Sequence, residues 1–376
     1  MPFLFRNSAS VSFRRLPKAM LALPFVFVTA IGVTQAFAQI ATGTVMASTG
    51  SGKVTEYSPI GTFLTQLDTA TGAVNGTGYT TGSTFDSAGN FYVTDFDAQR
   101  VSKFDPNGFL VNAAFGGPAY HNPESIVPDA AGHLYAGQAG NVHNVYGQAD
   151  GTQNVLKFDS TGILLATFSP PVEIRGTDWV DLGPDQCTLY YTSESVDILS
   201  FNVCTNTPGP NFNVAPLPKP AYAHRLRHNG EMLVADTSAV IRLSASGAQI
   251  QTYTLPVTSL LFALSLDPDG TSFWTADLVT GQVFRVDIAS GTLITTFPAN
   301  ASNGASGFKA LAGLSVKGEN FASQLCIAGI PGQPNCHGKC VSELAGEFGG
   351  IDNASRVLRF SSVSALQNAI RNFCGS

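Results

Sequence analysis

The stretch Phe85-Asp86-Ser87-Ala88-Gly89 decides the fold, because its pattern returns at Leu266-Asp267-Pro268-Asp269-Gly270. Each copy has an apolar run, an Asp-x-x-Gly turn, two β-rich runs separated by a turn, and an apolar-aromatic finish at Phe115 or Phe297. A pattern of this length that recurs along a chain is typical of a β-propeller, in which each copy forms one four-stranded blade.

Weaker copies of the pattern start near Ile126, Val180 and Leu226. When the copies are aligned on the first Asp of the turn, each has one anchor position. The six anchors are Asp86, Asp129, Gly183, Arg227, Asp267 and Lys317. Successive anchors lie 40 to 54 residues apart, which is the spacing expected of propeller blades.

The two ends of the repeat predict how the ring closes. Residues 43–68 supply three strands, at Val45–Ala47, Val54–Tyr57 and Thr62–Leu67, without a first strand before them. Residues 311–316 supply a first strand with no followers. Joined in one blade, they complete a six-bladed β-propeller and leave no open sheet edge at the seam.

The phrases Phe91-Tyr92-Val93-Thr94-Asp95, Val101-Ser102-Lys103-Phe104-Asp105 and Met232-Leu233-Val234-Ala235-Asp236 resemble NHL repeats. More broadly, residues 43–318 resemble the propellers of the gluconolactonase and senescence-marker family. The resemblance implies a six-bladed propeller. It leaves the activity open, because this repeat occurs in enzymes and in binding modules.

The first 38 residues have the pattern of a bacterial-type secretory signal. Residues 1–18 carry Arg6, Arg14, Arg15 and Lys18 and no acid, and an apolar run precedes the small-residue site Ala36-Phe37-Ala38. Cleavage after Ala38 is expected, by a general or a twin-arginine route, and the mature protein is expected to be secreted or periplasmic. No other segment is apolar enough to cross a membrane.

Removal of these four cations changes the formal charge from −6 to −10. A negative surface repels phosphate backbones, so the sequence disfavours nucleic-acid binding. Cationic partners and metal ions fit this charge better.

The first strand of each blade lines the channel of a propeller, so the position five residues before each anchor marks one mouth of that channel. These positions are Thr81, Glu124, Asp178, Tyr222, Phe262 and Ala312. Three polar members, Glu124, Asp178 and Tyr222, fall on consecutive blades. His224 lies two residues after Tyr222, and strand alternation predicts that it points to the same side.

Carboxylates from neighbouring strands suit Ca²⁺ or another divalent cation, and an imidazole shifts the preference toward zinc. The sequence therefore predicts Glu124, Asp178 and His224 as candidate metal ligands, with Tyr222 facing a ligand; the alternative is a set of solvated acids. The gluconolactonase-like enzymes hold a divalent ion at this mouth with acids and an Asn. There the metal polarises a lactone carbonyl while an acid activates water. Glu124 and Asp178 match these acids, and no Asn stands at an equivalent position.

Blade 3 has a long segment, Gly137–Asn154, between its second and third strands. Its His143 and Tyr146 are expected to overhang the same face as Glu124. Segments of this length are uncommon without a role, so the alternatives are a ligand-facing lip over the channel and a tolerated surface insertion.

An even number of cysteines in an exported chain predicts disulfides. Blade 4 contains an expected hairpin, Leu189–Ser193 and Ile198–Phe201. A register that pairs Glu194 with Asp197 places Cys187 opposite Cys204. A disulfide between them should contribute about 3 kcal/mol to the free energy of unfolding.

Residues 320–376 are expected to form a small helical unit that needs disulfides for stability. The favoured bonds are Cys326–Cys340 and Cys336–Cys374, with 326–336 and 340–374 as the alternative and zinc at Cys336 and Cys340 as a further one. The unit is expected either to cap the ring or to dock to a partner.

The sequence thus predicts a signal peptide at 1–38, a propeller at 39–319 and a helical unit at 320–376. It contains no G-x-S-x-G, phosphate-loop or H-E-x-x-H motif. The favoured function is a monomeric exported module that binds a small molecule or an envelope or extracellular protein. The alternative is a divalent-metal-dependent hydrolase of the lactonase or esterase type, with its site at the channel mouth.

Overall fold

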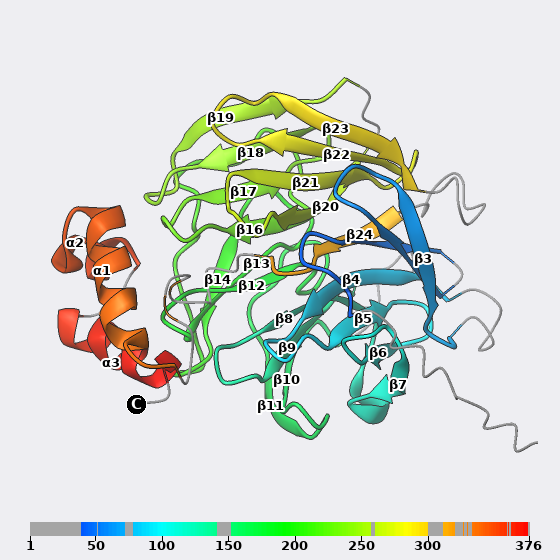
Figure 1. Cartoon of the computed structure of the whole chain (residues 1–376), viewed down its shortest axis with the longest axis horizontal. Coiled ribbons are helices and arrows are strands. Elements are labelled where there is room, and N and C mark those ends of the chain that lie inside the picture. Colours follow the sequence, from blue (N-terminus) through cyan, green and yellow to red (C-terminus); the bar gives the residue numbers. More distant parts are fainter. Residues whose placement is uncertain are drawn as a thin grey trace, which may run out of the picture. The chain divides into compact units, whose positions relative to one another are not determined.

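Six four-stranded antiparallel sheets form the blades of a β-propeller (Figure 1). The computed structural model describes residues 39–50, 52–71, 78–140, 152–256, 260–299, 311–319, 326, 329, 333–358, 360 and 362–374. Cleavage after Ala38 therefore concerns residues outside the described part of the chain. Within that part, no helix is long and apolar enough to cross a membrane.

The first three blades are built as follows. Blade 1 contains β24 (Leu311–Val316), β1 (Val45–Thr49), β2 (Lys53–Tyr57) and β3 (Phe63–Asp68); blade 2 contains β4 (Thr80–Phe85), β5 (Phe91–Asp95), β6 (Arg100–Phe104) and β7 (Leu110–Phe115); blade 3 contains β8 (Pro123–Pro128), β9 (Leu134–Gln138), β10 (Val155–Phe158) and β11 (Leu164–Phe168).

The other three blades have the same order. Blade 4 contains β12 (Val180–Leu182), β13 (Thr188–Tyr191), β14 (Leu199–Asn202) and β15 (Thr207–Pro208); blade 5 contains β16 (His224–Leu226), β17 (Met232–Ala235), β18 (Ala239–Leu243) and β19 (Gln249–Thr254); blade 6 contains β20 (Leu261–Leu266), β21 (Ser272–Asp277), β22 (Gln282–Asp287) and β23 (Leu293–Pro298).

The ring closes as predicted, through pairing of the last strand with the first. β24 pairs antiparallel with β1, with Val316 opposite Val45 and Leu314 opposite Ala47. The two ends of the repeat therefore share one sheet, and the backbone groups along this seam are hydrogen-bonded.

Each predicted anchor directly follows the last residue of a first strand. In blade 2 the Asp86 N–H donates to the Asn90 carbonyl (3.0 Å) and the Gly89 N–H donates back to the Asp86 carbonyl (2.9 Å). The same pair of bonds surrounds Asp267 in blade 6. In blade 1 the anchor Lys317 makes the corresponding bonds across the seam, to the Thr44 carbonyl (2.9 Å) and from the Gly43 N–H (2.8 Å). The anchors thus mark an equivalent position in every blade, which confirms the alignment.

The anchor acids also meet cations inside the blades. Lys157 pairs with Asp129 (3.2 Å), and Arg285 pairs with Asp267 (2.6 Å). In blades 2, 3 and 6 the third-strand cation lies over a second-strand ring, in the pairs Lys103–Tyr92 (5.2 Å), Lys157–Tyr135 (4.8 Å) and Arg285–Trp274 (5.5 Å). These cation–π contacts stabilise the blades that keep Asp at the anchor.

The apolar core lies between neighbouring blades. First and second strands such as β4, β5, β20 and β21 are buried along their whole length, whereas fourth strands such as β7 are mostly exposed. Trp179 and Trp274 are both fully buried in this core. The inner strands are therefore buried throughout, with small polar side chains such as those of Thr80 and Ser83 beside the apolar ones.

The inner strands approach each other closely at two glycines. A Cβ on Gly313 of β24 would lie 1.9 Å from the Thr81 carbonyl oxygen, and one on Gly82 of β4 would lie 2.5 Å from the Glu124 carbonyl oxygen. No side chain fits in these spaces, so the neighbouring first strands depend on glycine to pack.

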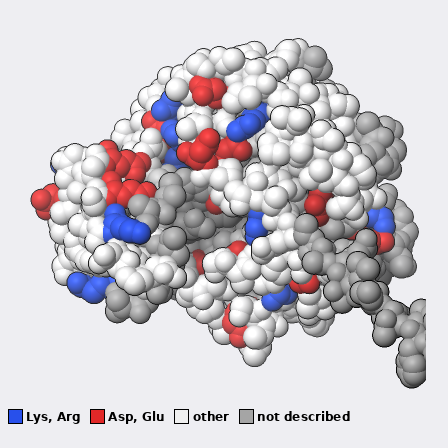
Figure 2. Space-filling view, viewed as in Figure 1, with Lys and Arg blue, Asp and Glu red and all other residues white. Residues whose placement is uncertain are grey.

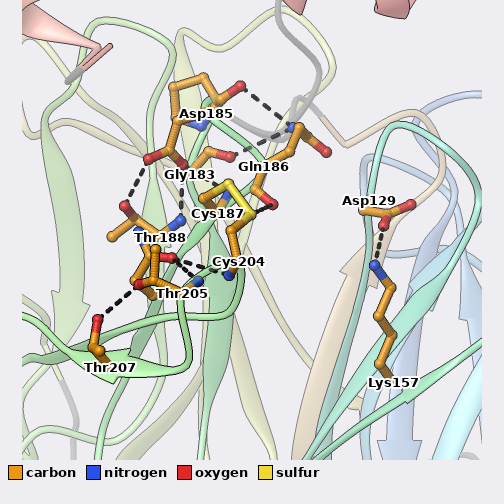
Figure 3. The surroundings of a disulfide bond; sticks show 12 residues. Asp129, Lys157, Gly183, Asp185, Gln186, Cys187, Thr188, Cys204, Thr205 and Thr207 are labelled. Carbon is orange, nitrogen blue, oxygen red and sulfur yellow. Dashed lines mark hydrogen bonds and ion pairs between the residues drawn. A yellow bond between two sulfur atoms is a disulfide. The ribbon is translucent and has the colours of Figure 1, made fainter. Parts of the chain in front are cut away.

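The disulfide Cys187–Cys204 is present as predicted, but the predicted register is wrong by one residue (Figure 3). β13 and β14 pair Leu189 with Phe201, so the residue opposite Cys187 is Val203, whose N–H donates to the Cys187 carbonyl (2.8 Å). Beyond β14 the chain turns, and the bond is reached from this turn with the Cα atoms 5.2 Å apart. The turn expected around Glu194–Asp197 is in fact a longer connection, from Tyr191 to Leu199.

The C-terminal unit is helical as predicted, with three helices, α1 (Cys336–Phe348), α2 (Ile351–Val357) and α3 (Val363–Cys374) (orange to red in Figure 1). Gly349 ends α1 in the left-handed conformation, and the Ser362 hydroxyl accepts from the Ala365 N–H (3.1 Å) at the start of α3. The favoured disulfides, Cys326–Cys340 and Cys336–Cys374, are both formed, so these sulfurs are not zinc ligands.

We predict that Gly313→Ala lowers the free energy of unfolding by about 2 kcal/mol or more, because the new methyl group overpacks the inner strands. The control is Gly346→Ala on the exposed side of α1, where a Cβ meets nothing within 4 Å. That change should be neutral or should stabilise by up to about 1 kcal/mol. Denaturant titrations of both variants measure the difference, and equal stabilities would contradict the packing argument.

The double variant Cys187→Ser, Cys204→Ser should be less stable than the native protein by about 3 kcal/mol, because the bond restricts the unfolded chain. Urea unfolding under non-reducing conditions gives this value. An unchanged unfolding midpoint would show that the bond does not contribute to the stability of blade 4.

Candidate functional site

A cavity of about 230 Å³ lies at the channel mouth that the anchor alignment selected. Three of the six aligned positions line it, namely Glu124, Tyr222 and Phe262. The other lining residues are Tyr79, Phe96, Arg175, Glu194, Leu260 and Leu278. The cavity therefore combines apolar walls with a small number of convergent polar groups, as ligand sites do.

Two pairs of aromatic rings form its walls. Tyr79 and Phe96 meet edge to face with their ring centroids 6.3 Å apart, and the Phe96 N–H donates to the Tyr79 carbonyl (2.8 Å). Tyr222 and Phe262 have their centroids 5.1 Å apart, and the Ala223 N–H donates to the Phe262 carbonyl (3.2 Å). Backbone hydrogen bonds thus hold both pairs in place.

Glu124 lies on β8, and Asp178 lies in the segment that leads into β12. Asp178 is wholly buried, and its backbone is fixed by bonds to Thr192 (3.0 Å) and to the Ser125 hydroxyl (2.9 Å). Its carboxyl group interacts with that of Glu124. The structure therefore brings together the two acids predicted for this mouth.

Arg175 and Glu194 complete the polar side of the cavity. One terminal nitrogen of Arg175 donates to Glu194 Oε1 (3.2 Å), and the other lies 3.8 Å from Glu124 Oε2. The guanidinium also lies 5.6 Å from the centre of the Phe96 ring. One cation is therefore shared by two carboxylates and an aromatic face.

Sequence reasoning missed both residues of this pair. Arg175 belongs to an irregular segment between blades 3 and 4, outside the repeat. Glu194 lies between β13 and β14, in the segment predicted as a tight turn. Glu194 has a φ of 48°, a conformation that side chains other than Gly rarely adopt. The only signal in the sequence was a charged residue at each of these loops.

Burial shifts the pKa values of these acids upward. The pKa of Asp178 lies well above its ordinary value because the group is buried and the Glu124 carboxyl is close. Burial and Asp178 raise the pKa of Glu194 to about 8, against the opposing effect of Arg175. At neutral pH Glu194 therefore holds a proton for most of the time, and burial favours the protonated form of Asp178.

His224 does not line the cavity. It lies within β16, fully buried, and burial together with Arg225 lowers its pKa to about 3. Tyr222 precedes the first residue of β16, so the alternation that predicted a shared direction does not extend to it. His143 and Tyr146 lie outside the described residues.

The residues at the mouth fit a divalent cation poorly. Glu124 already has a guanidinium beside it, and Asp178 favours its neutral form. In the described ranges, one group of three potential ligands has all its ligand atoms within 4.8 Å, and it consists of cysteines in disulfides. Glu124, Asp178 and His224 do not form such a group.

The space between the inner strands below this level is occupied by buried polar pairs. Ser83 and Ser315 share a hydrogen bond (2.9 Å), and Arg225 pairs with Glu319 (2.8 Å) under almost complete burial. The Asp181 carboxylate accepts from the Leu226 N–H (2.7 Å). The residues of these pairs are held by partners within the protein.

A second cavity, of about 340 Å³, lies beside turns of blades 3 and 4 and is also lined by Phe373. Its Asp129 carboxylate is paired with both His133 (2.9 Å) and Lys157 (3.2 Å), so its charges are already neutralised. On the face shown in Figure 2, Lys and Arg lie interspersed with Asp and Glu, without a broad basic field among the described residues.

The raised pKa of Glu194 predicts a pH dependence of stability. Between pH 5 and 8 the Glu194 carboxyl group is mostly ionised in the unfolded chain and mostly protonated in the folded chain. The free energy of unfolding therefore falls as the pH rises. In Glu194→Gln the fall in the free energy of unfolding between pH 5 and pH 8 should be smaller by at least about 1 kcal/mol. Urea unfolding at both pH values measures it.

The control is Asp68→Asn. Its pKa is lowered by Lys53, so Asp68 is ionised in both states throughout this range and its loss should leave the pH dependence unchanged. The same pH dependence in Glu194→Gln and in the native protein would show that Glu194 titrates at its ordinary value.

No protein-family model and no curated protein matches this sequence. Among solved structures, the chain is similar to one in the crystal structure of the nidogen/laminin complex, with a TM-score of 0.55, 14% identity and coverage of 74% of this chain and 98% of that chain. It is also similar to virginiamycin B lyase from Staphylococcus aureus (TM-score 0.43, 14% identity, coverage 58% and 69%) and to a streptogramin B lyase (0.44, 13%, 58% and 68%). At this identity the nidogen/laminin likeness shows the fold alone: a six-bladed β-propeller.

Proposed function

We propose that this chain is an exported β-propeller that binds a small organic molecule in the cavity at its channel mouth. The observation that carries the proposal is the cavity itself, whose two aromatic pairs are held by backbone bonds and whose polar groups converge from three blades. Such a prearranged site binds with little loss of side-chain entropy.

Two features support export. The first 38 residues have the order of a secretory signal. All six cysteines are paired in disulfides, and disulfides persist mainly in oxidising compartments.

The metal-dependent hydrolase is a weaker candidate on physical grounds. A divalent ion at Glu124 would have to displace or repel the Arg175 guanidinium, and as a ligand Asp178 would have to be ionised although burial raises its pKa. A matched acid and base around a substrate space are also needed for hydrolysis.

A protein partner is the second candidate function. Several fourth strands carry exposed apolar side chains near their starts, including Leu64 on β3, Val111 on β7 and Leu165 on β11. Exposed apolar surface of this kind favours association when it is contiguous.

The proposal predicts a ligand-dependent rise in melting temperature. Expression of the full chain in a bacterial host should yield exported protein that begins at Gln39, which mass spectrometry checks. A library of small organic molecules is then screened. A ligand at 100 times its Kd stabilises by about 2.7 kcal/mol, a measurable shift. Leu260→Trp fills the cavity and should abolish the shift, whereas Leu293→Trp on exposed β23 should keep it.

Two outcomes would contradict the proposal. If no compound raises the melting temperature, the protein-partner candidate gains. If calcium, magnesium or zinc raises it relative to a chelator, and Glu124→Ala removes that effect, the metal-dependent hydrolase replaces it. A metal effect that survives in Glu124→Ala would exclude the mouth as the metal site.

A further inference from the structure

We infer that the ligand of the mouth cavity is an organic cation, with a positively charged nitrogen on a small apolar body. The inference rests on the function proposed above and adds the chemical class of the ligand. It stands on three observations: the aromatic walls, the excess of carboxyl groups, and the manner in which the cavity already holds a guanidinium.

The aromatic walls suit a cation with an apolar body. Ring faces attract positive charge, and the attraction is greater where water is excluded. Tyr79 and Phe262 are buried, while Phe96 and Tyr222 are partly exposed at the cavity. Leu260 and Leu278 add apolar surface. A volume of about 230 Å³ accommodates a molecule with a single ring.

Carboxyl groups outnumber cations among the charges that act on the cavity. Asp97, Glu124 and Asp178 act on the Tyr79 hydroxyl, and Glu194 and Asp178 act on that of Tyr222. In the described part of the chain, Arg175 is the cation that acts on both hydroxyls. Moreover, neither oxygen of the buried Asp178 makes a hydrogen bond of normal geometry. A positive ligand would favour the ionised forms of Asp178 and Glu194 and would interact with their carboxylates.

Arg175 shows how the cavity holds a positive group. Its guanidinium is placed between Glu124 and Glu194 and over Phe96, and its side chain is 24% exposed. A ligand cation can use the same carboxylates and the same ring. Arg175 therefore competes with the ligand as a tethered cation.

An anionic ligand would need the opposite arrangement. Both terminal nitrogens of Arg175 are directed to carboxylates of the protein, so the guanidinium fork is not open to a ligand carboxylate. The Glu124 carboxylate, beside Arg175, would repel such a ligand at the same place. Removal of Arg175 should therefore tighten the binding of a cationic ligand and weaken the binding of an anionic one.

The test uses three probes of similar size: benzyltrimethylammonium, which is permanently positive, neutral benzyl alcohol and anionic phenylacetate. Isothermal titration calorimetry on the exported protein should show binding of the cation at least about tenfold tighter than of the other two, a difference of about 1.4 kcal/mol.

Arg175→Gln should tighten the binding of benzyltrimethylammonium by about tenfold, because the tethered competitor is gone. Glu194→Gln and Phe96→Leu should each weaken it by a similar factor. Lys53→Gln and Asp68→Asn, which remove one cation and one acid from a surface ion pair, are the matched controls and should have little effect. Melting curves establish that each variant is folded.

The outcomes separate this inference from the proposed function. Tighter binding of benzyl alcohol or phenylacetate than of the cation, or loss of binding in Arg175→Gln, would overturn the inference and leave the mouth as a binding site. If none of the three probes binds, and the library screen likewise finds no ligand, both fail together. If the library finds only neutral or anionic ligands, the inference alone fails.

Discussion

The pairing of β24 with β1 is the interaction on which the structure depends. The two strands are separated by most of the chain, and each would otherwise present an unpaired edge. Their pairing costs the entropy of closing a very long loop, but that cost grows slowly with length. Once the seam is closed, every blade lies between two neighbours. The inner strands, which an isolated blade would expose to water, then pack together as the core.

Close packing of the inner strands also determines where a ligand can go. At Gly82 and Gly313 the neighbouring backbones leave no room for a side chain, and lower in the channel the pair Arg225–Glu319 is buried. The space for a small molecule lies instead near the starts of the first strands, where irregular segments supply Arg175 and Glu194. The rigid part of the repeat thus positions a site whose charges come largely from connections.

Burial and charge oppose each other in this site. Asp178 and Glu194 are kept near Arg175 by the backbone, yet low solvent exposure makes their ionised forms unfavourable. One guanidinium compensates them only in part. The arrangement lowers the free energy of unfolding at neutral pH relative to a cavity without acids. A bound cation would stabilise the ionised acids and offset this unfavourable contribution.

Local features of the chain were sufficient to predict much of this molecule. The anchor positions, the six blades, the shared closing blade and the three favoured disulfides all depend on short-range patterns or on cysteine pairing, and the structure confirms them. The hairpin register at Cys187 was one residue out, because a longer connection between β13 and β14 replaces a tight turn. Tertiary structure alone decided that Arg175 lies between Glu124 and Glu194 and that His224 is buried away from them. These positions depend on irregular segments and on packing between blades, which no repeat pattern in the sequence specifies.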